Sequence, residues 1–348
     1  MLFNYTNARL SKLAIHYIGN KGNEDNIFLS DSLVEDITQE MEAVLISYFL
    51  SGFKSEEIFS FWHESELELN NIYNFISDIF ERKGDIVKKS QNIGKHLYEH
   101  SIHPNIKGGE LYIATIKNCI FKDEQVEVIV LIKSENKENF IKSETDNGKY
   151  NLNLERGLSL SKVDKGCIIF NTEKNKGYNL LLINGSSQAD AQYWKDNFLR
   201  VKQAENEYQY TVNFLNLTKQ YVTNQLDTDF EVNKTDKIDF LNRSIEYFKE
   251  HDTFEKDEFE KEVFQDKAVI KSFNNFETEY SKDHDVKIID HFEISPNALK
   301  KQVKSFKSVL KLDKNFHVYI HGNKNLIEKG FDRDSGMHYY KIFFKEEA

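Results

Sequence analysis

The spacing of apolar side chains changes twice along this sequence, and that change constrains the fold more than any other feature. In residues 33–48 and 67–82, apolar residues recur every three or four positions, which predicts amphipathic helices. From Ile106 to residue 183, β-branched runs separated by short polar links predict an antiparallel meander of four to six strands. After residue 185 the helical spacing returns. We therefore expect an α+β fold with helices packed beside an antiparallel sheet.

The length of 348 residues is enough for two domains. We predict an N-terminal α+β domain over residues 1–186. Residues 187–348 should then hold a helical segment and a small mixed C-terminal unit. In that unit, Ser295 followed by Pro296 has the chemistry of a helix start, and the alternation over residues 316–321 predicts a strand.

Local signals place several helix boundaries. Ser30 or Asp31 is the expected cap of the first helix, and a third helix is expected from Asp85 to His100. A single long helix is expected over residues 255–282.

Composition narrows the class of protein. Hydrophobic residues make up 39% and aromatic residues 13%, which indicates a globular chain. No apolar run approaches the roughly 18 residues of a membrane span and no export signal is recognised, so we expect a cytoplasmic protein with no membrane contact. Cys119 and Cys167 each lie in an apolar run, where a buried thiol is the expected state.

The distribution of charge reverses near residue 300. The whole chain has a net charge of −11, which argues against a protein that simply coats DNA. Residues 251–299 hold 6 basic and 13 acidic residues, whereas residues 300–329 hold 8 basic and 2 acidic ones. Within the basic stretch, we predict a nucleic-acid-binding patch at Lys300, Lys301, Lys304, Lys307, Lys311 and Lys314. The lysines would line one face if the helix continued, and would cluster without alignment if a strand began near Phe306. The alternative is a solvated face, neutralised by the acidic stretch 255–262.

Catalytic motifs are weak in this sequence. His96, Glu99 and His100 have the H-x-x-E-H order of inverted zinc peptidases, but no third ligand is indicated, and we expect an exposed, polar helix end instead. His317 and His321 would share one face of a strand, which we expect to be solvated. Residues 332–336 predict a turn. Phosphate-binding glycine loops and nucleophile motifs are absent from the sequence, so we expect no enzyme, no metal and no cofactor.

The order of several segments resembles one known family. The segments that carry the resemblance are Phe28–Leu33, Ser60–Glu66, Lys149–Leu154, Leu158–Leu160, Gly177–Gly185 and Ala189–Leu199. In this order the chain resembles the bacterial nucleoid-associated protein family NdpA over nearly its whole length. The resemblance implies association with bacterial chromosomal DNA in the nucleoid and with DNA-topology proteins, without an established reaction or transferable site residues.

Three functional hypotheses follow. The first is a non-catalytic nucleoid-associated protein that touches DNA, without sequence preference, through the lysine patch. The second is a protein-interaction scaffold whose association with DNA is indirect. The third and most remote is a zinc-dependent hydrolase at His96, Glu99 and His100. The oligomeric state is left open by the sequence.

Overall fold

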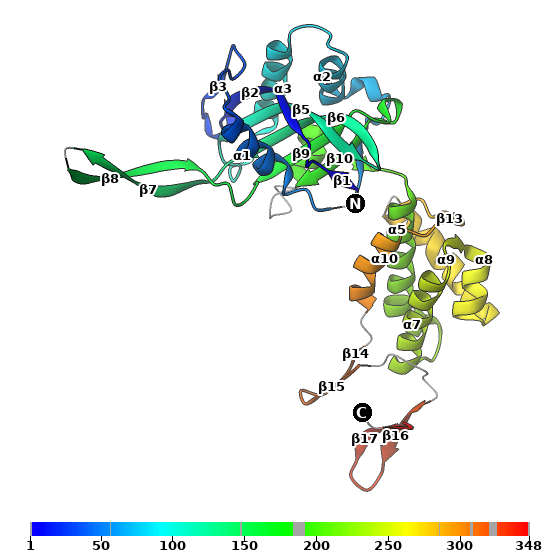
Figure 1. Ribbon diagram of the computed structural model, residues 1–348. Coiled ribbons are helices and arrows are strands. Elements are labelled where there is room, and N and C mark those ends of the chain that lie inside the picture. The colour runs from blue at the N-terminus through cyan, green and yellow to red at the C-terminus, as the bar shows by residue number, and fades with distance from the viewer. Residues whose placement is uncertain are drawn as a thin grey trace. The chain divides into compact units, whose positions relative to one another are not determined.

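The chain is described here from a computed structural model, shown in Figure 1, that covers residues 2–55, 57–146, 148–183, 192–284, 286–306, 309–319 and 326–346. Its contacts divide into two compact units, Met1–Ala204 and Glu205–Ala348, which we call the N-terminal unit and the C-terminal unit. The domain boundary predicted between residues 186 and 187 lies outside the described residues. Within the described ranges, no helix combines the length and apolar character needed to cross a membrane.

The described part of the N-terminal unit is built on a nine-stranded sheet in which all neighbours are antiparallel. In spatial order its strands are β11 (Val201–Gln203), β4 (Phe59–Phe61), β10 (Asn179–Ile183), β9 (Lys165–Phe170), β6 (Glu124–Ser134), β5 (Gly109–Phe121), β2 (Arg9–Ile18) and β3 (Ile27–Leu29), with β1 (Phe3–Asn4) beside β5. The α+β class is confirmed. The sheet is larger than the predicted meander because strands from both ends of the unit join it.

Helices cover both faces of this sheet. They are α1 (Gln39–Leu50), α2 (Asn71–Phe80) after a 3-10 turn η2 (Leu67–Leu69), α3 (Ile86–His100) and a π-helical segment η4 (Gln192–Leu199). Strand residues alternate between two cores: Ile113 and Leu131 pack with α2, α3 and η4, whereas Ala114 and Val130 pack with α1. Burial on both faces explains the near-continuous apolar runs of β5 and β6.

The helix starts test the predicted caps. Asp85 caps α3 by accepting a hydrogen bond from the backbone N–H of Val87, so this predicted helix is confirmed. The predicted cap of the first helix is wrong: Thr38, and neither Ser30 nor Asp31, accepts from the N–H of Met41. The chain before Thr38 is irregular, and Asp36 has a left-handed φ of 57°.

Buried polar groups occur inside the N-terminal unit. The ammonium groups of Lys133 and Lys165, 0% and 2% exposed, lie 3.1 and 2.6 Å from the two carboxylate oxygens of Glu135. Cys119 and Cys167 are free thiols in the two different cores, on opposite faces of the sheet. Burial raises the pKa of the Cys119 thiol to about 12.

A long hairpin separates from the sheet after β6. It consists of β7 (Lys137–Asp146) and β8 (Lys149–Leu158), which pair with each other in continuous register. Figure 1 shows it as a two-stranded ribbon, which we call the arm. The alternation of Tyr150, Leu152 and Leu154 in its second strand is typical of a strand, whereas the polar sequence of β7 does not predict one.

The C-terminal unit has an aromatic core. Phe214 lies within 4.2 Å of Phe254 and 5.0 Å of Phe259, measured between ring centroids. The helices around it are α5 (Glu207–Gln220), η5 (Tyr221–Gln225), α6 (Leu226–Asp229), α7 (Lys234–Glu250), α8 (Lys256–Phe259), η6 (Glu260–Phe264), α9 (Lys267–Asp283) and α10 (Pro296–Val303). The single helix predicted over 255–282 is wrong, because Gln265 has a left-handed φ of 64° that interrupts it.

Short strand pairs complete the C-terminal unit. They are β12 (Thr253–Glu255) with β13 (His291–Glu293), β14 (Val309–Leu312) with β15 (Phe316–Tyr319), and β16 (Ile327–Asp332) with β17 (Met337–Ile342). A small apolar cluster around Ile238 of α7 and Leu310 of β14 holds the last two hairpins. The predicted turn at 332–336 joins β16 to β17.

Candidate nucleic-acid interface

The predicted lysine patch begins on α10, whose start follows its sequence. Ser295 caps the helix by accepting from the N–H of Ala298, and Pro296 occupies the first turn, as predicted. Ala298 and Leu299 are buried, and α10 lies beside α5 (Figure 1). The helix ends at Val303 and a 3-10 turn follows, so the continuous lysine face of a longer helix is not formed.

The lysines therefore cluster in two places instead of aligning. Lys300 and Lys301 lie in the last turn of α10, Lys304 opens the 3-10 turn, and Lys314 lies in the turn between β14 and β15. The side chains of these four lysines are exposed. Lysines in a last turn also stabilise the helix dipole, which is the simplest structural role for the first pair. Lys307 and the side chain of Lys311 lie outside the described residues.

Neighbouring carboxylates do not neutralise the described lysines. Among the described residues, Lys300, Lys304 and Lys314 form no ion pair, and the nearest polar partner of Lys301 is the hydroxyl of Tyr208, at 3.5 Å.

The acidic stretch 255–262 has other partners. Glu255 lies 2.5 Å from His291, and Glu258 lies 4.0 Å from His251. Of the two basic residues within the stretch, Lys256 pairs with Glu277 at 2.7 Å. Among the described residues, the carboxylates of residues 255–262 therefore do not neutralise the lysine patch, which was the alternative that the sequence left open.

Packing adds one cation that the sequence did not indicate. Lys219, in the last turn of α5, places its ammonium 6.0 Å from the centre of the ring of Phe306. Phe306 lies two residues after Lys304 in the chain. It is 81 residues from Lys300 in sequence and becomes a neighbour of the patch only because α10 packs on α5. The sequence alone gives no signal for Lys219, because its place beside the patch depends on the packing of α10 against α5.

Among the described residues, His96, Glu99 and His100 are not grouped closely enough to share one metal ion. His96 and His100 lie near each other on α3, with ring centroids 4.4 Å apart, but Glu99 forms an ion pair with Lys21. Burial, then the neighbouring His100, lowers the pKa of His96 to about 4. In the described parts of the chain, the one group of three side chains spaced for a metal ion is His251, Glu258 and Glu262, with ligand atoms within 4.8 Å of one another.

The histidine pair of the C-terminal strand is only partly described. His317 lies on β15 and is exposed, as expected. His321 lies outside the described residues. On the other face of this strand, Phe316 is 64% exposed, whereas Val318 packs in the cluster around Ile238 and Leu310.

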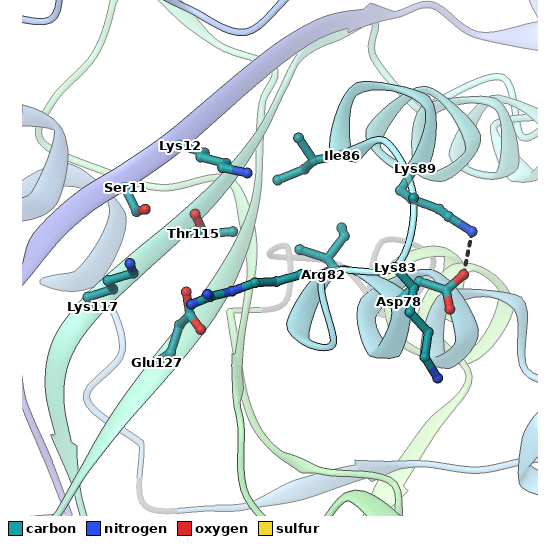
Figure 2. A pocket seen from close by; sticks show the side chains of 12 residues that line it. Ser11, Lys12, Asp78, Arg82, Lys83, Ile86, Lys89, Thr115, Lys117 and Glu127 are labelled. Atoms are coloured by element: carbon teal, nitrogen blue, oxygen red, sulfur yellow. Dashed lines mark hydrogen bonds and ion pairs between the residues drawn. The ribbon is translucent and has the colours of Figure 1, made fainter.

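A second cationic feature lies in the N-terminal unit. It is a pocket of about 350 Å³ between the α2–α3 connection and the face of β2, β5 and β6, shown in Figure 2. Its lining residues are Ser11, Lys12, Asp78, Ile79, Arg82, Lys83, Gly84, Ile86, Lys89, Thr115, Lys117 and Glu127. Sequence reasoning missed this pocket, because its basic residues come from four separate segments.

The charges of this pocket are partly matched by carboxylates. Lys89 forms an ion pair with Asp78, and the guanidinium of Arg82 points towards Glu127 (Figure 2). Within the described ranges, Lys12 and Lys117 have no ion-pair partner. The net positive charge of the pocket is therefore smaller than its five basic residues suggest. The exposed lysines of the C-terminal unit form the clearer cationic surface.

Comparison with known proteins identifies a family. The family model described as NA37, nucleoid-associated protein YejK, matches residues 14–335, which include nearly all of both units. No curated protein matches the chain.

Proposed function

The chain belongs to the family of the nucleoid-associated protein YejK, and on that premise we propose that it binds duplex DNA directly through the lysine patch. The patch comprises Lys300, Lys301, Lys304, Lys307, Lys311 and Lys314, with Lys219 beside it. The family supports a role at the nucleoid. Direct contact with DNA and the absence of a catalytic reaction are our inference.

One observation carries the proposal: described lysines of the patch are exposed and free of carboxylate partners in a chain of net charge −11. An unpaired ammonium on the surface can displace a counterion from a phosphate at little cost, whereas a paired one must first lose its carboxylate. Lysine makes point-charge contacts to phosphate and the patch holds no arginine, which reads base edges better. We therefore expect binding without sequence preference.

The test is a fluorescence-anisotropy titration of purified, nucleic-acid-free protein against labelled duplex DNA between 50 and 200 mM salt. The logarithm of affinity should fall linearly with the logarithm of salt concentration, by about 0.9 per phosphate neutralised. The combined change Lys300→Glu, Lys304→Glu and Lys314→Glu should remove measurable binding at 150 mM salt.

A matched control separates the patch from net charge. Lys261, Lys267 and Lys271 are exposed residues of the same unit without ion-pair partners among the described residues. Changing all three to glutamate alters the net charge by the same amount, and should weaken binding only slightly. Equal losses in both triple variants would show that total charge, and not the patch, governs binding.

A second candidate function is a protein-interaction scaffold that reaches DNA through partners such as DNA-topology proteins. The net charge of −11 favours it, because most of the surface repels phosphate. Affinity purification with and without nuclease discriminates between the two candidates. Partners retained after nuclease, together with no anisotropy change on naked DNA, would favour the scaffold.

A further inference from the structure

The arm formed by β7 and β8 is exposed along almost its whole length. Its register runs from Lys137 opposite Leu158 to Asp146 opposite Lys149. All residues of β7 and the first eight of β8 are exposed. An isolated two-stranded hairpin is marginally stable in water, and usually needs a further layer against one face.

The two faces of the arm differ in chemistry, because side chains alternate along each strand. One face carries Ile141 opposite Leu154, and then Leu152 and Tyr150 towards the tip. The exposed fractions of these four residues are 69%, 73%, 70% and 78%. We call this the apolar face of the arm.

The opposite face is mostly polar and internally matched; its one large apolar side chain, Phe140, is 47% exposed and lies beside Gly157 of the paired strand. Lys142 lies 2.5 Å from Glu144 and 3.9 Å from Glu155, all on this face. Asn153 donates a hydrogen bond of 3.4 Å to Glu144. The apolar face, whose four large side chains are 69–78% exposed, is therefore the less covered of the two faces.

We propose that the apolar face of the arm is a dimerisation surface, covered by the same face of a second copy of this chain. In such an isologous contact the two arms pack face to face about a two-fold axis, so one self-complementary patch supplies both sides. The inference is independent of the DNA-binding proposal.

The exposed area supports a second copy as the occupant. Four large side chains at these exposures present on the order of 400–500 Å² of apolar surface, comparable with the largest patch on a typical monomer. Two copies together with their flanking polar groups would bury roughly 1,200 Å², the lower end of the range for stable interfaces.

Charge supports the same occupant. Residues 137–158 contain four basic and four acidic residues, whereas the whole chain has a net charge of −11. A neutral arm is a place where two copies can meet with little mutual repulsion, and it offers no attraction to DNA phosphates.

The test is sedimentation equilibrium of the full chain between 1 and 100 μM. The natural chain should dimerise. The double variant Leu152→Glu and Leu154→Glu places four like charges in the interface and should raise the dissociation constant at least 100-fold. The matched control is Asn151→Glu with Asn153→Glu, which makes the same charge change on the polar face of the same strand. This control should still dimerise.

A second measurement does not depend on destabilising the arm. Ser143→Cys lies on the apolar face and Asn151→Cys on the polar face, while Cys119 and Cys167 are buried. Mild oxidation should cross-link the first variant into a covalent dimer and leave the second without a disulfide cross-link, as read by non-reducing gel electrophoresis. A monomeric natural chain at 100 μM, or equal behaviour of the two faces in either experiment, would overturn the proposal and leave the arm to a different partner.

Discussion

His16 makes the stability of the N-terminal unit depend on pH. The side chain lies on β2 and is 1% exposed. The backbone N–H of Ser30 donates to its Nδ1 at 3.1 Å, and its Nε2 lies 3.0 Å from the hydroxyl oxygen of Ser90. That hydroxyl donates its own proton to the carbonyl of Val87, at 2.7 Å. The Ser90 oxygen must therefore accept from His16, which fixes a neutral imidazole with its proton on Nε2.

Protonation of this imidazole is costly in the folded state. A second proton on Nδ1 would break the bond from Ser30 and leave a buried charge, and burial lowers the pKa of His16 to about 4 from an ordinary value of 6.5. Because the folded pKa lies below the unfolded one, the unfolded chain binds the proton first as pH falls. Stability is complete above about pH 6.5 and is lost as pH falls towards 4. At pH 5 the loss is about 1–2 kcal/mol, at 1.36 kcal/mol per pKa unit with an allowance for solvent screening.

Urea unfolding monitored by tryptophan fluorescence measures this loss. Both tryptophans, Trp62 and Trp194, belong to the N-terminal unit, so the signal reports that unit alone. Between pH 7.5 and pH 5 the urea midpoint should fall by roughly 0.5 M, at an m value of about 3 kcal/mol/M.

The variant His16→Asn keeps an acceptor for the N–H of Ser30 but has no titrating group. It should start about 1 kcal/mol less stable, because the bond to Ser90 is lost, and should show a smaller pH dependence. His96, whose pKa is also lowered to about 4, is present in both proteins, so their difference isolates His16. An unchanged pH dependence in the variant would refute the assignment.

Three further substitutions test the packing. Gly177→Ala should destabilise the N-terminal unit by about 3 kcal/mol or more in urea unfolding, because φ is 90° and the new Cβ would lie 2.2 Å from the carbonyl oxygen of Phe61. Gly148→Ala is the matched control: φ is 76° but no atom lies within 4 Å of the new Cβ, so this change should cost about 1 kcal/mol. Glu135→Gln should cost about 3–5 kcal/mol in the same assay, because it removes the charge between two buried lysines. Phe214→Ala should cost about 3–5 kcal/mol in the C-terminal unit, measured by calorimetry, and leave the tryptophan-monitored transition unchanged.

Local chemistry predicted those elements whose signals lie within a few residues. The caps of α3 and α10 and the hairpin of β9 with β10 are examples, because a cap side chain or a short polar link acts on its own neighbours. The start of α1 shows the limit. Leu33 and Ile37 have helical spacing, but they pack against opposite faces of the sheet, so their spacing arises from an irregular segment that passes the sheet edge.

Short strands and the arm show a second limit. β4 and β11 have three residues each, too few for a period to be recognised, and their place in the sheet depends on partners more than 100 residues away. The strand β7 is polar along most of its length, because no core covers it. Its apolar face is visible only once the register with β8 brings Ile141 opposite Leu154.

The same distinction applies to the cationic surfaces. The lysines after residue 300 are close in sequence, so a charge count predicted them, although their alignment depended on where α10 ends. Lys12 and Lys117 face one pocket because β2 and β5 are neighbours in the sheet, although the two lysines are 105 residues apart in sequence. Charge counts along a sequence detect a cationic site that one segment forms. A site whose residues come from several strands can be predicted only when the strand order of the sheet is known. Basic residues of the N-terminal unit should therefore be tested as a separate phosphate contact if the lysine variants of the C-terminal unit retain part of the salt-dependent binding.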